Sequence, residues 1–259
     1  MREERSLRYS RHELLSVIGK TGQDSIRRGT AVIVGLGGLG GTVSILLARS
    51  GVGALRLVDP DRVDWTNMQR QALFDEDDAE AGRAKAEAAV RRLMAINSEV
   101  TYEAVPEALG QANAEAILRG AAVAVDCLDN FRARAVLNQA CVKLGIPLVH
   151  GACVATHGTV TTIVPGETAC YECIVPDAAT RIATHTSSTV GVFAPAVFAV
   201  ASLQAAEALK ILSGDKESAL KGKMLWLDVW NGNVTTFSVP RNHDCPVCGR
   251  RQLPLLEHV

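Results

Sequence analysis

The sequence is poor in aromatic residues and carries almost no net charge. Aromatic side chains make up 4% of the 259 residues, too few to form base-stacking surfaces. The 27 Lys and Arg residues nearly balance the 28 Asp and Glu residues, which gives a formal charge of -1. This balance provides no bulk electrostatic attraction to a polyanion. We therefore expect neither nucleic acid nor a membrane among the partners.

A secretory signal and long uninterrupted apolar runs are also missing. The most apolar stretch, residues 190–206, contains Pro195 and is interrupted by Gln204, which favours a buried helix over a membrane span. Residues 1–5 are mostly charged and lack the apolar centre of a secretory signal. With 47% hydrophobic and 21% charged residues, the composition is that of a folded globular chain. These features predict a cytoplasmic protein.

The chain contains seven cysteines, of which four form two Cys-x-x-Cys pairs: Cys170 with Cys173, and Cys245 with Cys248. Without a secretory signal such pairs favour metal binding over disulfides. Four thiolates can hold Zn²⁺ in a closed, structural site, which would tie the middle of the chain to its C-terminal tail. Two unrelated pairs or a redox pair are the alternatives. The other three cysteines lie in core-like segments, where we expect them to pack as small hydrophobic residues: Cys127, Cys141 and Cys153.

Apolar, β-branched segments alternate with helical segments over the first half of the chain. We predict strands over 31–34, 54–58, 101–105, 123–126 and 148–151. Between them we predict a helix that ends near residue 49 and further helices over 82–96, 112–118 and 131–144. Alternation of this kind is typical of a parallel sheet with helices on both faces.

The pattern changes after residue 151. A β-rich segment over 159–164 is followed by an exposed loop over 184–189, a long helix over 193–212, and a hairpin of strands over 223–228 and 234–239. We therefore predict an α/β fold with a Rossmann-like sheet, mostly parallel with antiparallel strands in the C-terminal half, plus a four-cysteine zinc knuckle. Residues 1–259 would form one domain, with an N-terminal helical arm (1–30), a nucleotide-binding half (31–151) and a zinc-binding half (152–259).

A glycine-rich loop directly follows the first predicted strand. It has the pattern Gly35-x-Gly37-Gly38-x-Gly40, which lets backbone N–H groups approach a phosphate at a helix N-terminus. Asp59 ends the next strand 24 residues after Gly35, a position that suits an acid bound to a ribose hydroxyl. A purely structural turn is the alternative. The loop alone does not distinguish ATP from a dinucleotide such as NAD.

Further polar residues follow the ends of the predicted strands, where ligands bind in open α/β sheets. They lie after the second strand, at the start of the next helix and after the fourth strand: Asp61, Asn67, Arg70 and Gln71; Lys85; Asp129 and Asn130. Cations there can neutralise a triphosphate, and a carboxylate can hold Mg²⁺. Each charge alone is more often a solvated surface residue. Together, beside a glycine loop, they favour a nucleoside triphosphate over NAD.

The order and spacing of these residues resemble the ThiF/MoeB/HesA family, the bacterial ubiquitin-activating-type adenylyltransferases. The resemblance covers about residues 7–250 and rests on seven motifs. They comprise RYSRH at 8–12, GLGGLG at 35–40, DPD at 59–61, NMQRQ at 67–71, Gly82-x-x-Lys85, DCLDN at 126–130 and the two Cys-x-x-Cys pairs.

The resemblance implies a homodimeric enzyme that activates a carboxylate with ATP at two active sites. Family members adenylate the C-terminal glycine of a small ubiquitin-like sulfur-carrier protein that ends in Gly-Gly. They release pyrophosphate and leave an acyl-adenylate for later thiocarboxylate formation. The half over 152–259 would then bind both the carrier and zinc.

The same resemblance implies roles for single residues. Asp59 would hold the ribose, Asp129 would bind Mg²⁺, and Arg11 would reach into the partner subunit's ATP site. Asn67, Arg70 and Lys85 would contact the phosphates, and the four paired cysteines would hold zinc. We therefore expect the catalytic residues to be Arg11, Arg70, Lys85 and Asp129. The nucleotide-binding residues would be Gly35, Gly37, Gly38, Gly40, Asp59, Asp61, Asn67, Gln71 and Asn130.

The chain departs from the family pattern in one loop. Many relatives carry a cysteine before a Gly-Val-x-Ala-Pro helix entry, which here spans 191–195, but the preceding residues 184–189 contain none. A serine is a poor nucleophile without an adjacent base. We expect His185 to be a solvated loop residue, and a role as that base is the alternative. The resemblance with this departure predicts a purely adenylating enzyme that passes its product to a separate sulfur donor. The 259 residues would leave no room for a fused sulfurtransferase domain.

Three alternative functions remain open. Adenylation of a peptide or small-molecule carboxylate in a biosynthetic pathway would keep the same first step. An NAD-dependent oxidoreductase would use the glycine loop but would leave Arg70, Lys85 and the paired cysteines unexplained. A non-catalytic partner in a heterodimer would not need the ATP-facing residues, which are all present, including Arg11. The sequence does not reveal the carrier, the pathway or the sulfur donor.

Overall fold

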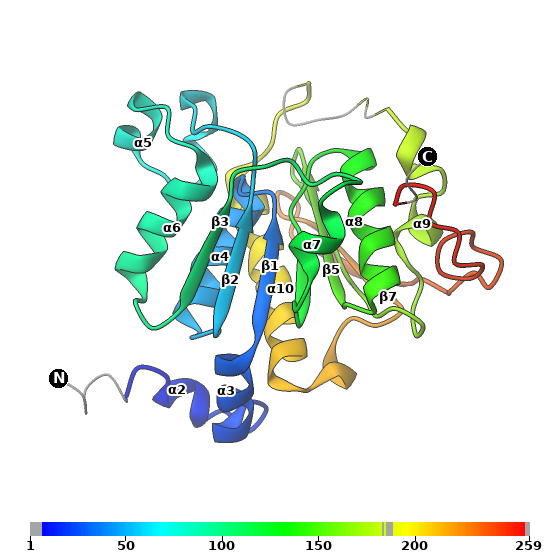
Figure 1. Ribbon diagram of the computed structural model, residues 1–259, viewed down its shortest axis with the longest axis horizontal. Helices are drawn as coiled ribbons and strands as arrows, with labels where there is room; N and C mark the ends of the chain where they lie inside the picture. Colours follow the sequence, from blue (N-terminus) through cyan, green and yellow to red (C-terminus); the bar gives the residue numbers. More distant parts are fainter. Residues whose placement is uncertain (1–6, 183, 185–188, 257–259) are drawn as a thin grey trace.

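The computed structural model describes residues 7–182, 184 and 189–256. Its centre is an eight-stranded sheet in the order β3-β2-β1-β4-β5-β6-β7-β8 (Figure 1). Five strands run parallel: β1 (Thr30–Val34), β2 (Ala54–Val58), β3 (Thr101–Val105), β4 (Val123–Asp126) and β5 (Leu148–Val154). Three antiparallel strands follow: β6 (His157–Ile163), β7 (Lys223–Asp228) and β8 (Asn233–Ser238). The predicted fold class is confirmed.

Helices cover both faces of the sheet. The α-helices are α2 (Ser10–Glu13), α3 (Gly19–Arg28), α4 (Gly38–Arg49), α5 (Glu76–Glu80), α6 (Lys85–Ile96), α7 (Ala114–Leu118), α8 (Phe131–Leu144), α9 (Tyr171–Ile174) and α10 (Ala194–Ser213). Short 3₁₀ turns lie at η1 (Trp65–Asn67), η2 (Ala178–Thr180) and η3 (Lys216–Ser218). Figure 1 shows α7 and α8 in front of the sheet, with α4 and α10 behind it.

The alternation of side chains along the strands explains this two-sided cover. In β1, Ile33 belongs to the apolar cluster that includes α4, α6 and α10, whereas Val32 and Val34 belong to the cluster that includes α7, α8 and α9. Successive residues of a strand point to opposite faces, and a parallel strand buried on both faces is continuously apolar. The short run of residues 31–34 therefore supports both layers.

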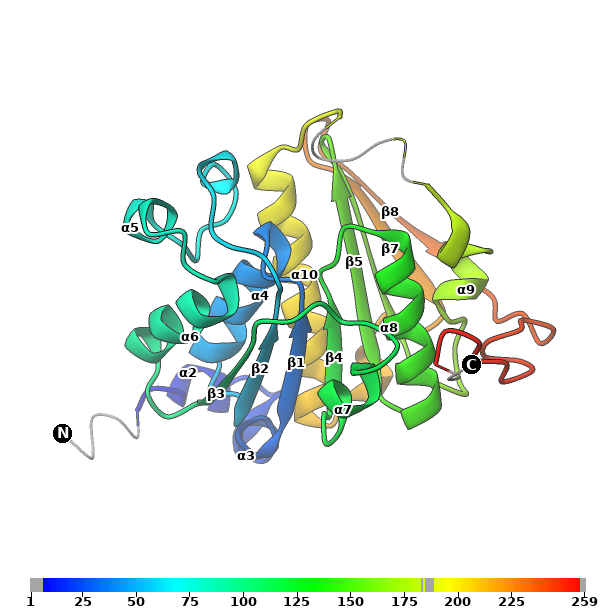
Figure 2. The same cartoon turned by 45° about the horizontal axis from the view of Figure 1, so that its top comes forward.

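The long apolar helix α10 is a core helix. Its 20 residues are long and apolar enough to cross a membrane, yet Val200, Ala201 and Gln204 are fully buried inside the protein. Gln204 Nε2 donates to the carbonyl of Asp126 at 2.8 Å, so the polar residue within the apolar run joins the helix to the sheet. Figure 2 shows α10 behind the sheet. This is the packing of a buried core helix, as the sequence predicts.

Several predicted element boundaries shift by a few residues. The helix predicted from residue 82 begins at Lys85, because Gly82 is left-handed (φ +52°) and Ala84 forms a bridge with Arg62. The predicted strands 148–151 and 159–164 extend towards each other as β5 and β6, whose last pair is Val154 with His157. The predicted hairpin around Asn231-Gly232 is present between β7 and β8.

Candidate nucleotide site and metal centre

The glycine loop makes a turn between β1 and α4 that leaves no room for side chains. Gly35 has a φ of +90°, and a Cβ on it would lie 2.7 Å from the carbonyl oxygen of Cys127. A Cβ on Gly40 would lie 1.8 Å from the carbonyl oxygen of Gly35. Because the turn is this tight, α4 begins at Gly38, directly beyond the end of β1. Its first-turn N–H groups carry partial positive charge and can bind an anion.

Asp59 fixes this glycine loop to the end of β2. Its carboxylate accepts hydrogen bonds from the N–H of Leu36 at 2.6 Å and from the N–H of Asp61 at 2.8 Å. Burial raises the pKa of Asp59, while Lys85 and the two backbone N–H groups oppose this rise. A carboxylate has about four acceptor positions, so Asp59 retains capacity for a further hydroxyl donor.

Lys85 lies at the start of α6 and is almost fully buried. Its ammonium group is 3.0 Å from the Oδ2 atom of Asp61, whose side chain is 66% exposed. A buried cation paired with an exposed, solvated carboxylate can exchange that carboxylate for a more highly charged anion. Lys85 is thus available to a phosphate group at the edge of the sheet.

Asn67, Arg70 and Gln71 form one polar cluster beside the glycine loop. Asn67 Oδ1 accepts hydrogen bonds from Arg70 Nη2 at 3.1 Å and from Gln71 Nε2 at 2.9 Å. A Cβ on Gly37 would lie 3.7 Å from Gln71 Nε2, and one on Gly38 would lie 3.0 Å from the Arg70 carbonyl oxygen. Within the described residues, the buried Oε1 atom of Gln71 has no hydrogen-bond partner, so an acceptor beside the loop remains open to a ligand.

Asp129 and Asn130 lie on the loop between β4 and α8. Asn130 is the N-cap of α8, and its Oδ1 accepts a hydrogen bond from the N–H of Ala133 at 2.8 Å. Asp129 is exposed. This loop starts beside the glycine loop, because a Cβ on Gly35 would lie only 2.7 Å from the carbonyl oxygen of Cys127. The two loops therefore share the carboxyl edge of the sheet.

Among the residues predicted for the nucleotide site, Arg11 is the one that lies elsewhere. It is exposed on α2, at the end of the molecule where α3 leads into β1 (Figure 1). The loops that follow β1, β2 and β4 lie at the opposite end of the strands (Figure 2). Within one subunit, Arg11 is therefore remote from the glycine loop.

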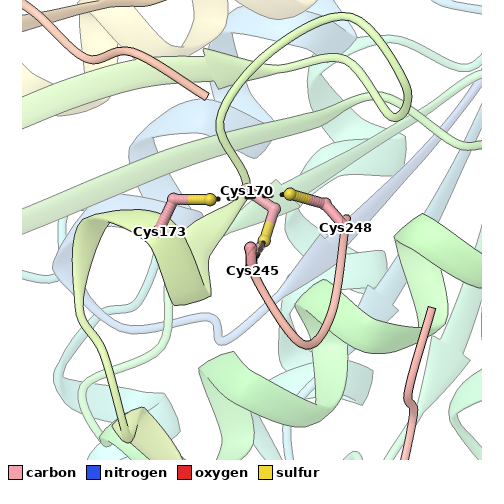
Figure 3. A group of neighbouring side chains, drawn as sticks. All are labelled: Cys170, Cys173, Cys245 and Cys248. Atoms are coloured by element: carbon pink, nitrogen blue, oxygen red, sulfur yellow. Dashed lines mark hydrogen bonds between the residues drawn. The ribbon is translucent and has the colours of Figure 1, made fainter. Parts of the chain in front are cut away.

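The four paired cysteines come together as the sequence predicts (Figure 3). Their Sγ atoms lie within 4.8 Å of one another, with 3.8 Å between Cys170 and Cys245 and 3.5 Å between Cys173 and Cys248. A disulfide needs about 2.05 Å, whereas a tetrahedron with Zn–S bonds of about 2.3 Å has edges of about 3.8 Å. The cluster fits a zinc ion.

The remaining cysteines are not activated. Cys127 and Cys141 are buried in the two apolar clusters, in agreement with the prediction of a packing role. Cys153 is half-buried, and burial raises the pKa of its thiol to about 12. Burial likewise raises the pKa of Cys127 well above the usual value. The residue His185 and most of the loop around it lie outside the described residues, and only its ends at Thr184 and Thr189 are described.

Sequence reasoning missed a buried polar network behind the Asp129 loop. Asp126 Oδ2 lies 2.6 Å from His150 Nδ1 and 3.6 Å from Arg134 Nε, and all three residues are buried. The ring of Tyr171, in the zinc knuckle, lies 4.9 Å from that of His150. No local pattern marks a buried arginine, although Asp126 belongs to the DCLDN motif at 126–130.

Comparison with known proteins gives a consistent set of relatives. Residues 9–247 match the ThiF family. The chain is 40% identical to the sulfur carrier protein ThiS adenylyltransferase of Bacillus subtilis (strain 168), over 97% of this chain and 74% of that protein. It is 36% identical to the molybdopterin-synthase adenylyltransferase of Escherichia coli (strain K12), over 96% of this chain and 98% of that protein.

A solved structure of similar fold is E. coli MccB. Its complex with ATP superposes with a TM-score of 0.79 at 29% identity and covers 93% of this chain and 73% of MccB. Its complex with MccA-N7isoASN superposes with a TM-score of 0.81 at 28% identity and covers 93% of this chain and 74% of MccB.

Proposed function

This chain belongs to the ThiF family of adenylyltransferases, and we propose that it adenylates the C-terminal glycine of a ubiquitin-like sulfur-carrier protein that ends in Gly-Gly. The observation that carries this proposal is the meeting of three features at one sheet edge. They are the glycine loop with its helix N-terminus, the cations Arg70 and Lys85, and the exposed carboxylate of Asp129.

The proposed reaction joins a carboxylate to the α-phosphate of ATP. A carboxylate oxygen of the terminal glycine forms a bond to the α-phosphorus, and the bond from that phosphorus to the oxygen bridging to the β-phosphate breaks. Pyrophosphate leaves with the electron pair of that bond, and a carrier acyl-adenylate remains. The carboxylate is already ionised at neutral pH, so no general base is required.

The main barrier is the repulsion between an anion and a polyanion. Arg70 and Lys85 would lower it by binding the phosphate oxygens on which charge develops. Asn67 and Gln71 would orient the same phosphates through their side-chain NH₂ groups, and their mutual hydrogen bond of 2.9 Å keeps both amides beside the glycine loop. Holding the two reactants in line would supply much of the remaining acceleration.

The nucleoside end of ATP would lie against the start of the loop that follows β2. Asp59 would accept a hydrogen bond from a ribose hydroxyl while it holds the Leu36 and Asp61 amides. Asp61 would release Lys85 to the phosphates, and Asn130 would border the site while it caps α8. Asp129 would hold Mg²⁺, whose role is to neutralise phosphate charge; an exposed carboxylate suits this ion, which binds proteins through few carboxylates plus phosphates.

The second half of the chain would bind the carrier and the zinc ion. We propose that residues 152–259, together with the arm over 1–30 and the nucleotide half over 31–151, work as a single adenylation domain in the cytoplasm. The strands β6, β7 and β8 continue the sheet of the nucleotide half. This shared sheet supports a single domain in which one half binds the nucleotide and the other binds the carrier and zinc.

Sulfur transfer would take place on another protein. A relay cysteine is absent from residues 184–189, and burial raises the pKa of Cys153 to about 12, so this thiol is protonated at neutral pH. We propose that the acyl-adenylate is released to a separate sulfur donor, which converts it to a thiocarboxylate.

The active form would be a homodimer in which Arg11 acts across the interface. Arg11 lies at the end of its own sheet opposite the glycine loop (Figure 1), so within one subunit it cannot act at that loop. A two-fold dimer can bring a residue of one subunit to a site of the other. Each of two sites would then contain Arg11 of the partner subunit.

A second candidate function is adenylation of a peptide carboxylate. The similarity to E. coli MccB in complex with MccA-N7isoASN favours it. The first chemical step, transfer of AMP to a carboxylate, would be the same, and only the acid that receives the AMP would differ. The two functions differ in the substrate that stimulates ATP–pyrophosphate exchange.

Exchange of labelled pyrophosphate into ATP tests both functions. The enzyme is incubated with candidate carriers that end in Gly-Gly, with the same carriers lacking those two residues, or with short peptides. Stimulation by intact carriers alone supports the proposal, and stimulation by peptides alone supports the second function. Tight NAD binding with no exchange by any acid overturns both.

A further inference from the structure

The loop that carries Asp129 is held from behind by two buried charged residues. Asp126 Oδ1 accepts a hydrogen bond from the N–H of Leu128 at 3.0 Å. Arg134 Nη2, which comes from α8, donates to the carbonyl of Leu128 and lies 3.4 Å from the carbonyl of Gly151. Both backbone polar groups of Leu128, the residue before Asp129, are therefore fixed by side chains.

These two residues are also tied to each other and to β5. Arg134 Nε lies 3.6 Å from Asp126 Oδ2, and His150 Nδ1 lies 2.6 Å from the same oxygen. Asp126, Arg134 and His150 are all less than one-tenth exposed. The buried Asp126–Arg134 pair keeps a single geometry, because movement of one partner leaves the charge of the other unpaired in the protein interior.

The zinc knuckle packs directly on this network through Tyr171. This residue lies between Cys170 and Cys173 and is 1% exposed. Its ring is 4.9 Å from that of His150, whose Nδ1 lies 2.6 Å from Asp126 Oδ2. Its backbone N–H donates to Asn138 Oδ1 on α8 at 2.9 Å. The short helix α9 is therefore hydrogen-bonded to α8, the helix that supplies Arg134.

We propose that Asp126, Arg134 and Tyr171 are positioning residues that couple the four-cysteine centre to the Asp129 loop. The path runs from the metal-binding turn through the Tyr171 ring and His150 to Asp126. Asp126 pairs with Arg134, and both side chains hold the backbone of Leu128. The role of the loop in binding Mg²⁺ rests on the function proposed above. An intact knuckle would then set the Mg²⁺ affinity of a site built on other elements.

Two mild variants test the path. Arg134→Lys keeps the buried positive charge but loses the planar fork that serves two carbonyls. Tyr171→Leu keeps an apolar side chain and removes the ring that lies against His150. Arg56→Lys is the matched control. Arg56 lies on β2, and it also pairs with a carboxylate (Glu103, 2.6 Å) and donates to main-chain carbonyls, which here belong to the end of α7 and not to the Asp129 loop.

The first measurement is amide hydrogen exchange of the segment 127–130 in the zinc-loaded protein. Loss of one hydrogen bond or of one ring contact costs roughly 1 kcal/mol, so we expect exchange about fivefold faster in Arg134→Lys and Tyr171→Leu. The glycine loop over 35–40 and the Arg56→Lys protein serve as unchanged references. Zinc removal by a chelator is expected to accelerate exchange of 127–130 in the wild-type protein as well.

The second measurement is the Mg²⁺ concentration that gives half-maximal pyrophosphate exchange. It is expected to rise about fivefold in both variants, for the same reason, and to stay unchanged in Arg56→Lys. Unaltered hydrogen exchange of 127–130 in both variants overturns the coupling, and faster exchange with an unaltered Mg²⁺ dependence overturns the positioning role. Should the wild-type protein show no pyrophosphate exchange with any acid, the proposed function fails, while hydrogen exchange still decides the coupling.

Discussion

Asp129 is exposed on the loop between β4 and α8, so its removal takes away a charge and no buried contact. We predict that Asp129→Ala lowers ATP–pyrophosphate exchange by about 100-fold or more, the effect of losing one group that stabilises transition-state charge. The midpoint of thermal unfolding is expected to change by no more than about 2 °C. Asp24→Ala, on α3, is the matched control, because the Asp24 side chain is 42% exposed and pairs only with Arg27 among the described residues. Near-normal exchange in Asp129→Ala would refute the assignment of Asp129 to Mg²⁺.

Cys153 provides a second prediction for a single side chain. Burial raises the pKa of its thiol to about 12, so at about pH 7.5 the thiolate fraction is on the order of 10⁻⁵. Alkylation of Cys153 is therefore expected to be very slow at neutral pH and to accelerate with rising pH until the pKa is passed. No thioester between the enzyme and a carrier is expected on non-reducing gels. A thiol-sensitive conjugate that disappears in Cys153→Ser would contradict this.

Single residues show what the sequence could and could not provide. The position of Asp59 at a strand end was readable, but its hydrogen bond to Leu36 N–H depends on two strands meeting in the sheet. Asn130 as an N-cap was readable from local rules, although sequence reasoning assigned it only to the nucleotide. Arg134 could not be found, because its burial arises from α8, β4 and β5 packing together.

Among the elements, the turn between β1 and α4 is the least tolerant of change. We predict that Gly40→Ala lowers the free energy of unfolding by about 3 kcal/mol, since its Cβ would lie 1.8 Å from a carbonyl oxygen and the backbone must move. Gly110→Ala is the control, because a Cβ there meets nothing within 4 Å. Urea titration of both variants checks the difference. Equal stability of the two proteins would show that the turn is not as tight as described.

The zinc knuckle permits a test by ligand removal. In Cys245→Ser the zinc content is expected to fall from about one ion per chain to near zero, because a closed site needs all four thiolates. The tail that carries Cys245 then loses its attachment to Cys170 and Cys173, and the unfolding midpoint falls. Elemental analysis and thermal melts measure both, with Cys153→Ser as the control. Full zinc content in Cys245→Ser would exclude this cysteine as a ligand.

Element boundaries show where local patterns end. The helix α8 and the strand β7 lie at the predicted residues 131–144 and 223–228, because their apolar patterns stop at an N-cap or a turn. The strands β5 and β6 are longer than predicted, and their tight connection uses Ala155 at a φ of +51°. A left-handed alanine has no sequence signal, since few residues other than glycine adopt that region.

At the scale of the whole molecule, the parallel direction of β1 to β5 follows from the chain's alternation of strands and helices. Parallel strands need helical crossovers, and the sequence supplies them up to β5, after which a direct connection leads to antiparallel β6. The meeting of two cysteine pairs separated by 75 residues was predictable from their chemistry. The contact between the knuckle and α8 was not, because it depends on how complete elements pack.

Mixed dimers test the proposed role of Arg11. We predict that Arg11→Ala and Asp129→Ala are each inactive, but that a re-equilibrated equal mixture regains about one quarter of the wild-type sites, because half of the dimers are mixed and each has one intact site. Pyrophosphate exchange before and after subunit exchange measures this gain. An inactive mixture whose subunits are shown to have exchanged would mean that Arg11 does not act across an interface.

The most direct test of the account is the mass of the carrier after reaction. A carrier that ends in Gly-Gly is incubated with the enzyme, ATP and Mg²⁺, with pyrophosphatase present to pull the reaction forward. The account predicts that intact-mass spectrometry finds the carrier heavier by one AMP moiety, and that a carrier lacking Gly-Gly stays unmodified. An unmodified intact carrier, or one joined to the enzyme as a thioester, would contradict the account.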